Sequence, residues 1–257
     1  MFDAARFRRE RPLRVAHALR RRVEGVGLLL AILASAALWV FVELADYVVE
    51  GETAELDRAI VLALRTPGAP GDPLGPLWLE EMGRDFTALG GIGVLGLVAA
   101  AASTLLWLQG NRRTACFVAA AVASGLVASL LLKSAFDRPR PELVPRLSYV
   151  HTASFPSGHS MMSALTYLTL AALLARHQPA RRVKIFLMGL AGLITLLVGV
   201  SRVYLGVHWP TDVLAGWALG AAWALGSLLV ARALARRGRL EHETPEVPAP
   251  RSRASGS

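Results

Sequence analysis

The stretch Ser201-Arg-Val-Tyr-Leu-Gly-Val-His208-Trp-Pro-Thr-Asp212 places an arginine, a histidine and an aspartate between two long apolar runs, residues 184–201 and 212–231. Each run has about the length needed to cross the hydrocarbon core of a membrane. Ionisable side chains are costly in or near such segments, and where they occur they point to function. We therefore expect a functional site between these two runs.

The composition of the chain indicates a membrane protein. Of its 257 residues, 54% are hydrophobic and only 18% are charged, which is not typical of a soluble globular protein. The formal net charge of +9 is compatible with nucleic-acid binding, but the arginines cluster in short segments between apolar runs and at the termini. This is the distribution of cytoplasmic loops, so we predict a membrane partner and no nucleic acid.

Six apolar runs predict an all-α fold, an integral membrane bundle of six transmembrane helices. Four runs precede the two named above, at residues 26–49, 86–108, 114–133 and 158–175. Within a proline-containing external loop, residues 57–64 have helical spacing, and we interpret them as a helix on the membrane surface. The predicted organisation is a basic cytoplasmic segment (1–24), a six-helix domain (25–239) with an external loop (50–85), and a disordered cytoplasmic tail (240–257).

The basic loops predict the orientation of the bundle. Residues 109–113, 176–184 and 232–239 are rich in Arg or Lys and belong with the basic N-terminus in the cytoplasm. Both termini are then cytoplasmic in a multi-pass protein of the cytoplasmic membrane. The ends of helices three to six that carry unusual polar residues meet on the extracytoplasmic face.

Three polar segments on that face predict a phosphate site. Lys133, Arg140 and Arg202 would repel one another unless a polyanion lay among them, and guanidinium groups match phosphate oxygens in a bidentate manner. Ser157 is a predicted helix cap with Gly158 behind it, which leaves backbone N–H groups free at a helix N-terminus. We expect these five residues to bind phosphate.

The two histidines of the polar segments suit acid, base and nucleophilic catalysis. Asp212 lies four residues after His208, so its carboxylate can reach an imidazole nitrogen and fix the tautomer. His208 is then the predicted nucleophile, which forms a phosphohistidine. His159, at the phosphate end of its helix, is the predicted acid for the leaving oxygen and the later base for water.

Together, the three polar segments resemble the signature of the type 2 phosphatidic acid phosphatase superfamily. The likeness consists of Lys133 with six residues before Arg140-Pro141, then Pro156-Ser157-Gly158-His159, then Ser201-Arg202 with five residues before His208 and three more before Asp212. No fixed position departs from this three-part signature. The resemblance implies a six-helix membrane phosphatase with no metal and no cofactor, and with the residue roles given above.

Our leading functional hypothesis is a phosphatase for a lipid phosphate or diphosphate at the outer face of the membrane. We favour undecaprenyl diphosphate, with phosphatidic acid and phosphatidylglycerol phosphate as the other substrates. The alternatives are a lipid phosphotransferase that uses the same site, and a non-catalytic lipid-phosphate binder or transporter. Vanadate-dependent haloperoxidases also resemble the signature, but they are soluble, so the six apolar runs argue against that class. The roles of Arg138 (headgroup contact or site residue), His151, Glu43 and Asp46 stay open.

Overall fold

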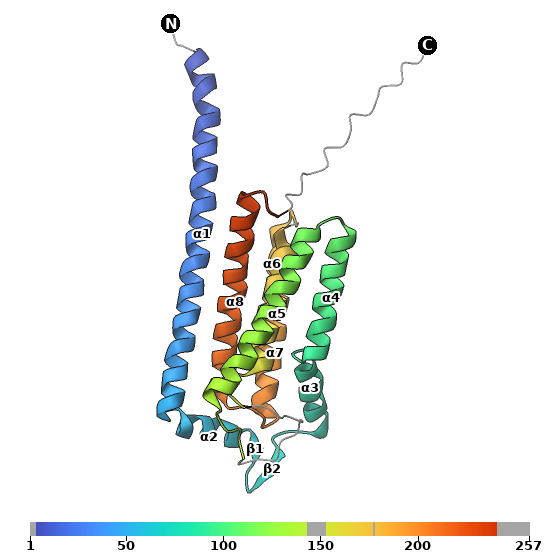
Figure 1. The fold of residues 1–257 in the computed structure, drawn as a ribbon. Coiled ribbons are helices and arrows are strands. Elements are labelled where there is room, and N and C mark those ends of the chain that lie inside the picture. Colours follow the sequence, from blue (N-terminus) through green and yellow to red (C-terminus); the bar gives the residue numbers. More distant parts are fainter. Residues whose placement is uncertain (1–3, 143–152, 177, 241–257) are drawn as a thin grey trace, which may run out of the picture.

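The computed structural model describes residues 4–142, 153–176 and 178–240. In this part of the chain the helices stand side by side, and a short hairpin lies at one end of the bundle (Figure 1). The elements are α1 (Ala4–Glu50), α2 (Ala54–Ala63), β1 (Arg65–Thr66), β2 (Ala69–Pro73), α3 (Leu77–Ala88), α4 (Ile92–Leu108), α5 (Arg112–Phe136), α6 (Gly158–Arg176), α7 (Arg181–Tyr204) and α8 (Pro210–Arg236).

The prediction of an all-α bundle with six membrane crossings is confirmed. Five helical stretches are each long and apolar enough to cross a membrane, and α3 with α4 supplies a sixth span that bends by 46°. The expected run at 86–108 is therefore interrupted near residues 89–91. Gly90 accounts for the tight packing of the bend, because an added Cβ would lie 2.5 Å from a methyl carbon of Val198 on α7.

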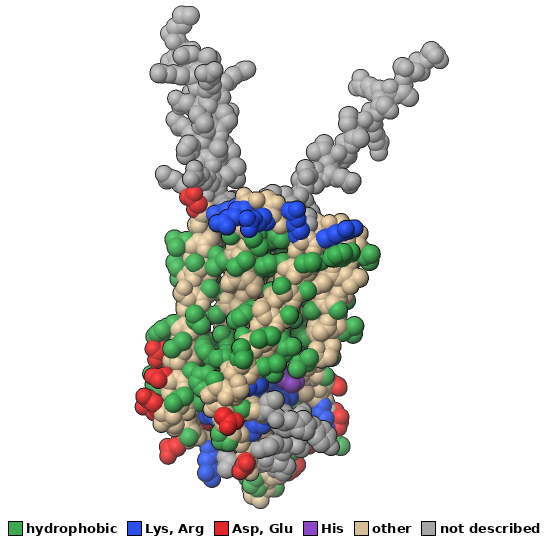
Figure 2. Space-filling view, viewed as in Figure 1, with side chains coloured by type: hydrophobic (Ala, Val, Ile, Leu, Met, Phe, Trp, Pro, Cys, Tyr) green, Lys and Arg blue, Asp and Glu red, His purple; other side chains and the backbone are tan. Residues whose placement is uncertain are grey.

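The two ends of the bundle differ in charge. Both termini leave from one end, whereas α2, the hairpin and α3 lie at the other (Figure 1). Lys and Arg side chains form a belt at the end that carries the termini, and the visible Asp and Glu side chains lie mainly at the opposite end (Figure 2). The positive-inside rule associates the basic end with the cytoplasm, so the predicted orientation remains the one this distribution favours.

The basic N-terminal segment and the external loop both contain helix. From residue 4 the N-terminal segment is helical and continuous with α1. Residues 57–64 fall mostly within α2, at the end of the bundle away from the termini. Val61 is completely buried and packs with Val203 and Val213, whereas Leu56 and Ile60 are exposed. One side of α2 therefore packs on the ends of α7 and α8, and the interpretation of this helix as lying on the membrane surface stays a prediction.

Close contacts between α6 and α8 set the position of the site. An added Cβ at Gly216 would lie 2.6 Å from the carbonyl oxygen of Ser157, and one at Gly220 would lie 2.4 Å from that of Met161. These two glycines therefore let α8 approach the backbone of α6, as small residues do between membrane helices. The start of α8 is thereby brought against the start of α6.

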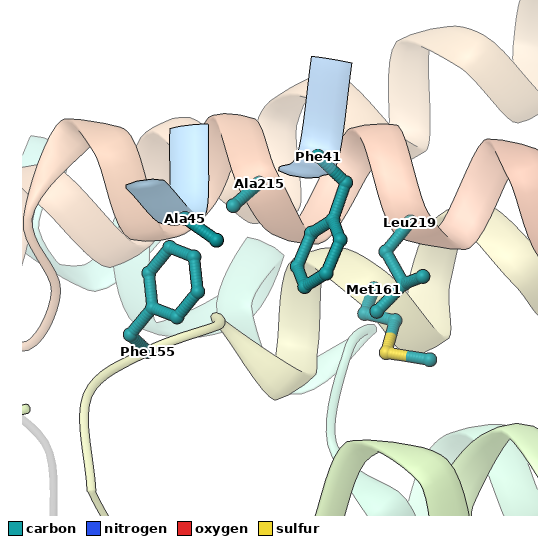
Figure 3. Packing of buried hydrophobic residues seen from close by; sticks show 6 residues of the cluster. All are labelled: Phe41, Ala45, Phe155, Met161, Ala215 and Leu219. Atoms are coloured by element: carbon teal, nitrogen blue, oxygen red, sulfur yellow. The ribbon is translucent and has the colours of Figure 1, made fainter. Parts of the chain in front are cut away.

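An aromatic cluster supports the segment that leads into α6. Phe155 stacks on Phe41 of α1 with ring centroids 6.0 Å apart, and it meets the edge of Phe136 of α5 at 4.9 Å. Figure 3 shows Phe41 and Phe155 with Ala45, Met161, Ala215 and Leu219 in the same buried cluster. The residues on either side of Phe155, Ser154 and Pro156, are also buried.

Candidate active site

The structure brings the three polar segments of the sequence together at the end of the bundle opposite the termini. Lys133 lies in the last turn of α5, and Arg140 follows in the segment after that helix. Gly158 and His159 open α6, Arg202 lies in the last turn of α7, and Asp212 lies in the first turn of α8. Of the eight predicted site residues, six have less than one tenth of their surface exposed: Lys133, Arg140, Ser157, Arg202, His208 and Asp212.

The imidazole of His208 is held at both nitrogens. Nδ1 lies 3.3 Å from Oδ2 of Asp212, and Nε2 lies 3.0 Å from Nη1 of Arg140. Arginine can only donate a hydrogen bond, so Nε2 must be the acceptor and Nδ1 must carry the proton. The lone pair of Nε2 therefore faces the cationic side of the site, and the N–H group faces the carboxylate.

The surroundings of His208 favour its neutral form. Only 1% of the residue is exposed, and this burial lowers its pKa well below the usual 6.5. The positive charges of Arg202, Arg140 and Lys133 lower the pKa further. A neutral imidazole keeps the lone pair that a nucleophile needs.

The carboxylate of Asp212 is fixed by contacts from three sides. Oδ2 accepts hydrogen bonds from the hydroxyl of Ser154 and, at 2.9 Å, from the backbone N–H of Trp209. Oδ1 accepts a hydrogen bond of 2.6 Å from Nη1 of Arg138. Ser154 Oγ also lies 3.3 Å from Nδ1 of His208, so this serine contacts both members of the pair.

Two of the three predicted phosphate-binding cations share one backbone acceptor. Lys133 Nζ donates to the carbonyl oxygen of Ala153 at 2.7 Å, and Arg140 Nη2 donates to the same oxygen at 3.3 Å. Arg140 Nη1 also donates to the carbonyl oxygen of Val207 at 2.6 Å. The segment around Ala153 thus holds both cations beside His208.

Arg202 is the cation with unused hydrogen-bonding capacity. Its Nη1 donates to Thr87 Oγ1 at 2.8 Å, and 1% of the residue is exposed. Within the described residues, its buried Nε and Nη2 atoms have no hydrogen-bond partner. A buried guanidinium with free donors is costly unless an anion satisfies it, so this group is suited to bind one.

The start of α6 has the predicted cap. The N–H of Ser160 and its hydroxyl both point to Ser157 Oγ, at 3.4 and 2.9 Å. The N–H groups of Gly158 and His159 belong to the first turn, where a helix offers them no carbonyl partner. An added Cβ at Gly158 would lie 3.2 Å from Cε of Lys133, so the side chain of Lys133 takes up the space beside this glycine.

His159 lies between the cations and the bend of the second span. Arg202, Lys133 and Arg140 are all close enough to act on its charge. On the other side, an added Cβ at Gly90 would lie 3.1 Å from Cβ of His159. The bend between α3 and α4 therefore forms one wall of the site beside this histidine.

Residues outside the predicted motifs complete the site. Arg138 donates from Nη2 to Asp57 Oδ2 at 2.8 Å, and Asp57 Oδ1 accepts the N–H of Thr211 at 3.0 Å. Arg138 is therefore bound to two buried carboxylates and is not available as a lipid-headgroup contact. Asp57, Thr87, Ser154 and Thr211 also contribute to the contacts of the site and were not predicted from the sequence.

One sequence signal could have found Asp57. It is four residues before the buried Val61, so an acid lies on the apolar face of a short amphipathic helix. Thr87 and Ser154 give no comparable signal, because neither stands at a spacing that distinguishes it from other polar loop or helix residues. Of the residues left open, Asp46 is exposed, Glu43 is partly exposed, and His151 lies outside the described residues.

Among the residues that the structure describes, the site contains anion-binding groups and no cluster of metal ligands. In the described ranges, no three residues of His, Cys, Asp or Glu come together as they would around a metal ion. The nearby donors are arginine and lysine, which do not ligate metal ions. Metal independence remains a prediction that a chelator can test.

Comparison with known proteins gives three relevant findings. The family profile described as the PAP2 superfamily matches residues 113–236, which include all eight predicted site residues. The chain is 47% identical over 91 residues to phosphatidylglycerophosphatase B of Bacillus subtilis (35% of this chain, 44% of the relative). It is 41% identical over 68 residues to an undecaprenyl-diphosphatase of Sulfolobus acidocaldarius (26% of this chain, 28% of the relative).

A solved structure agrees over most of the fold. The crystal structure of a transmembrane PAP2 type phosphatidylglycerolphosphate phosphatase from Bacillus subtilis has a TM-score of 0.69 at 28% identity, over 78% of this chain and 96% of the other. The matched stretches span less than half the length of the two curated relatives. The profile match, the three-part signature and the shared membrane fold agree, and residues 113–236 of the chain belong to the PAP2 superfamily.

Proposed function

We propose that the protein is a metal-independent phosphatase of lipid phosphates or diphosphates that acts through a phosphohistidine on His208. The observation that carries this proposal is the tautomer of His208. Its Nε2 lone pair faces Arg140, and the unpartnered nitrogens of Arg202 belong to the same group of cations. A nucleophile beside a group of cations, one of which has free donors, is the arrangement that phosphoryl transfer requires.

In the proposed first step, Nε2 of His208 attacks phosphorus, and the bond from phosphorus to the leaving oxygen breaks. Lys133, Arg140 and Arg202 neutralise the charge on the phosphoryl oxygens, and the first-turn N–H groups of α6 add further donors. His159 gives a proton to the leaving oxygen. The proton on Nδ1 of His208 stays in contact with Asp212, which stabilises the positive charge on the ring.

In the second step, water attacks the phosphohistidine and the bond from nitrogen to phosphorus breaks. His159 now accepts a proton from that water, which returns the acid to its first state. The products are inorganic phosphate and the free enzyme. Only the cations and a histidine acid are needed, so we expect no metal ion to take part.

The position of the site supports a lipid as the substrate. Lys133, His159, Arg202 and Asp212 all lie in the terminal turns of membrane-spanning helices, so a headgroup at the bilayer surface can reach them without leaving the membrane. We favour undecaprenyl diphosphate at the extracytoplasmic face of the cytoplasmic membrane, followed by phosphatidic acid and phosphatidylglycerol phosphate. The named activities of the relatives include the first and the last of these three lipid classes.

Phosphate release by the purified protein in detergent tests the proposal. The assay compares wild type and His208→Ala on the three lipids, with and without EDTA. We expect release that EDTA does not change and that His208→Ala abolishes. Loss in EDTA that a divalent ion restores would exclude the metal-independent mechanism. Product that forms only when an alcohol acceptor is added would favour a phosphotransferase.

A further inference from the structure

We propose that Asp57 and Arg138 are positioning residues that orient the Asp212–His208 pair, so that α2 is a functional part of the site. This inference rests on the proposed function. Asp57 lies outside the three polar segments and outside the family match at residues 113–236. It nevertheless reaches the first turn of α8, where Asp212 lies.

Arg138 divides its two terminal nitrogens between the two carboxylates. Nη1 donates to Asp212 Oδ1 at 2.6 Å, and Nη2 donates to Asp57 Oδ2 at 2.8 Å. Because the guanidinium is planar and rigid, a group held at both ends cannot turn. Asp57 therefore fixes the direction from which Arg138 meets Asp212.

Arg138 in turn decides which oxygen of Asp212 faces the histidine. Oδ1 is taken by the guanidinium, so Oδ2 is left for Ser154, the N–H of Trp209 and Nδ1 of His208. Without Arg138, the carboxylate could rotate and offer either oxygen in more than one orientation. The proton on Nδ1 would then lose its fixed acceptor, and Nε2 would lose its fixed direction.

Asp57 also holds the helix that carries Asp212. Its Oδ1 accepts the backbone N–H of Thr211 at 3.0 Å, and its Oδ2 accepts the hydroxyl of Thr211 at 2.6 Å. This N–H is one of the first-turn donors of α8 that the helix itself cannot satisfy. A carboxylate is also the favoured partner at the positive end of a helix.

The network is shielded from water, which makes its geometry specific. Asp57 is 1% exposed and Asp212 is not exposed, and the ring of Trp209 lies over Arg138 with 5.8 Å from Cζ to its centroid. Removal of one member would leave a buried charge without its partner. Two buried carboxylates already balance the charge of Arg138, so we assign this residue no role in phosphate binding.

The decisive experiment asks whether Asp57 and Arg138 act through Asp212. Asp57→Asn and Arg138→Gln are each made in the wild-type chain and in an Asp212→Asn chain, and kcat and KM are measured with a short-chain phosphatidic acid. We expect each change to lower kcat at least about tenfold in the wild-type chain with KM within about twofold. In the Asp212→Asn chain we expect neither change to lower kcat further. Arg84→Gln, which removes exposed ion pairs on α3, is the matched control and should leave kcat unchanged.

Two kinetic outcomes would overturn the inference. Equal losses of kcat in both chains would mean that Asp57 and Arg138 only stabilise the fold, and unchanged kcat in the wild-type chain would mean that they do not position the pair.

The same four variants are also compared by the rise in thermal unfolding temperature that orthovanadate causes, because vanadate can bond to Nε2 in place of phosphorus. We expect Asp57→Asn and Arg138→Gln to reduce that rise. If the wild type binds vanadate but releases no phosphate, the proposed function is contradicted, while the vanadate test of the inference can still be read. If Asp57→Asn and Arg138→Gln leave the vanadate-induced rise in unfolding temperature as large as in the wild type, the inference is overturned.

Discussion

Thr87 on α3 holds Arg202 on α7 through a hydrogen bond of 2.8 Å between Oγ1 and Nη1. The threonine takes one nitrogen of the guanidinium, and in the described part of the chain Nε and Nη2 have no other partner. The contact therefore keeps Arg202 in place while two of its nitrogens stay available. It also ties the bent second span to the helix that ends in the site.

Arg202→Gln should weaken the binding of phosphate. A hydrogen bond to a charged group contributes about 1.5 to 3 kcal/mol, so we expect the inhibition constant for inorganic phosphate to rise roughly 10- to 100-fold. Thr87→Val should have a smaller effect, because the cation remains. Phosphate inhibition of the purified protein measures both, and an unchanged constant in Arg202→Gln would show that Arg202 does not bind phosphate.

His159→Ala should remove the proposed acid and leave the proposed nucleophile, His208, in place. Protonation of the leaving oxygen typically contributes about 10² to 10⁴ in rate, so turnover of a lipid phosphate should fall by that factor. Release of p-nitrophenolate from p-nitrophenyl phosphate needs no proton, so this substrate should lose far less. His208→Ala should lose both activities. Equal losses on the two substrates in His159→Ala would contradict its role as the acid.

The stability of the protein should depend on pH through His208. Its pKa lies below 6.5 in the folded protein, because burial and the charges of Arg202, Arg140 and Lys133 disfavour the proton, while the unfolded chain binds the proton near 6.5. The stabilisation is thus present above pH 6.5 and is lost as the pH falls. Between pH 7.5 and 5.5 the wild type should lose roughly 1.4 kcal/mol relative to His208→Asn.

Thermal unfolding of both chains across this pH range gives the comparison. The wild-type unfolding temperature should fall more steeply toward acid than that of His208→Asn. Parallel curves would mean that folding leaves the pKa of His208 unchanged. The comparison does not depend on a substrate, whose own phosphate would titrate in the same range.

Arg65→Met should stabilise the fold. Arg65 on β1 is 5% exposed, and among the described residues its three side-chain nitrogens have no hydrogen-bond partner. Burial lowers its pKa, although Tyr204 and Glu80 oppose the shift. Replacement of such a charge by an apolar side chain of similar size should raise the free energy of unfolding by about 1 to 4 kcal/mol.

A thermal shift assay measures the effect of this substitution. Arg84→Met is the control, since Arg84 is more exposed and already paired with Glu80 and Glu81. A lower unfolding temperature for Arg65→Met would show that Arg65 has a stabilising partner. Phosphate release should stay unchanged in Arg65→Met, because the charged and polar neighbours of Arg65 among the described residues, Tyr204 and Glu80, are not predicted site residues.

The number of spans could be predicted from the sequence alone, and so could the fact that the three polar segments lie together. Apolar length determines how often a chain crosses a membrane, and alternation then determines which helix ends share a face. The bend near Gly90 and Gly91 could not be predicted in this way, because it follows from packing against Val198 and His159. The catalytic roles assigned to the histidines remain predictions.

Contacts between distant segments could not be predicted from the sequence. Arg138 meets Asp57 across 81 positions of the chain, and which carboxylate a loop arginine finds depends on where α2 docks. The acid four residues before Val61 was a signal that this side of α2 packs against the protein, but it did not identify the partner. The contact between Ser154 and Asp212 could not be predicted either, because it depends on the packing of Phe155 and on the position of α8.

The stack of Phe41 on Phe155 has a consequence for the membrane around the protein. Few residues in the spanning part of α1 are buried, and one of them, Phe41, touches the segment that carries Ser154. A helix in a thinner bilayer tilts to keep its apolar length covered. A tilt of α1 would shift Phe41 relative to Phe155, which supports the segment of Ser154. We therefore expect phosphate release to depend on bilayer thickness, and reconstitution in lipids of different chain length would measure this dependence.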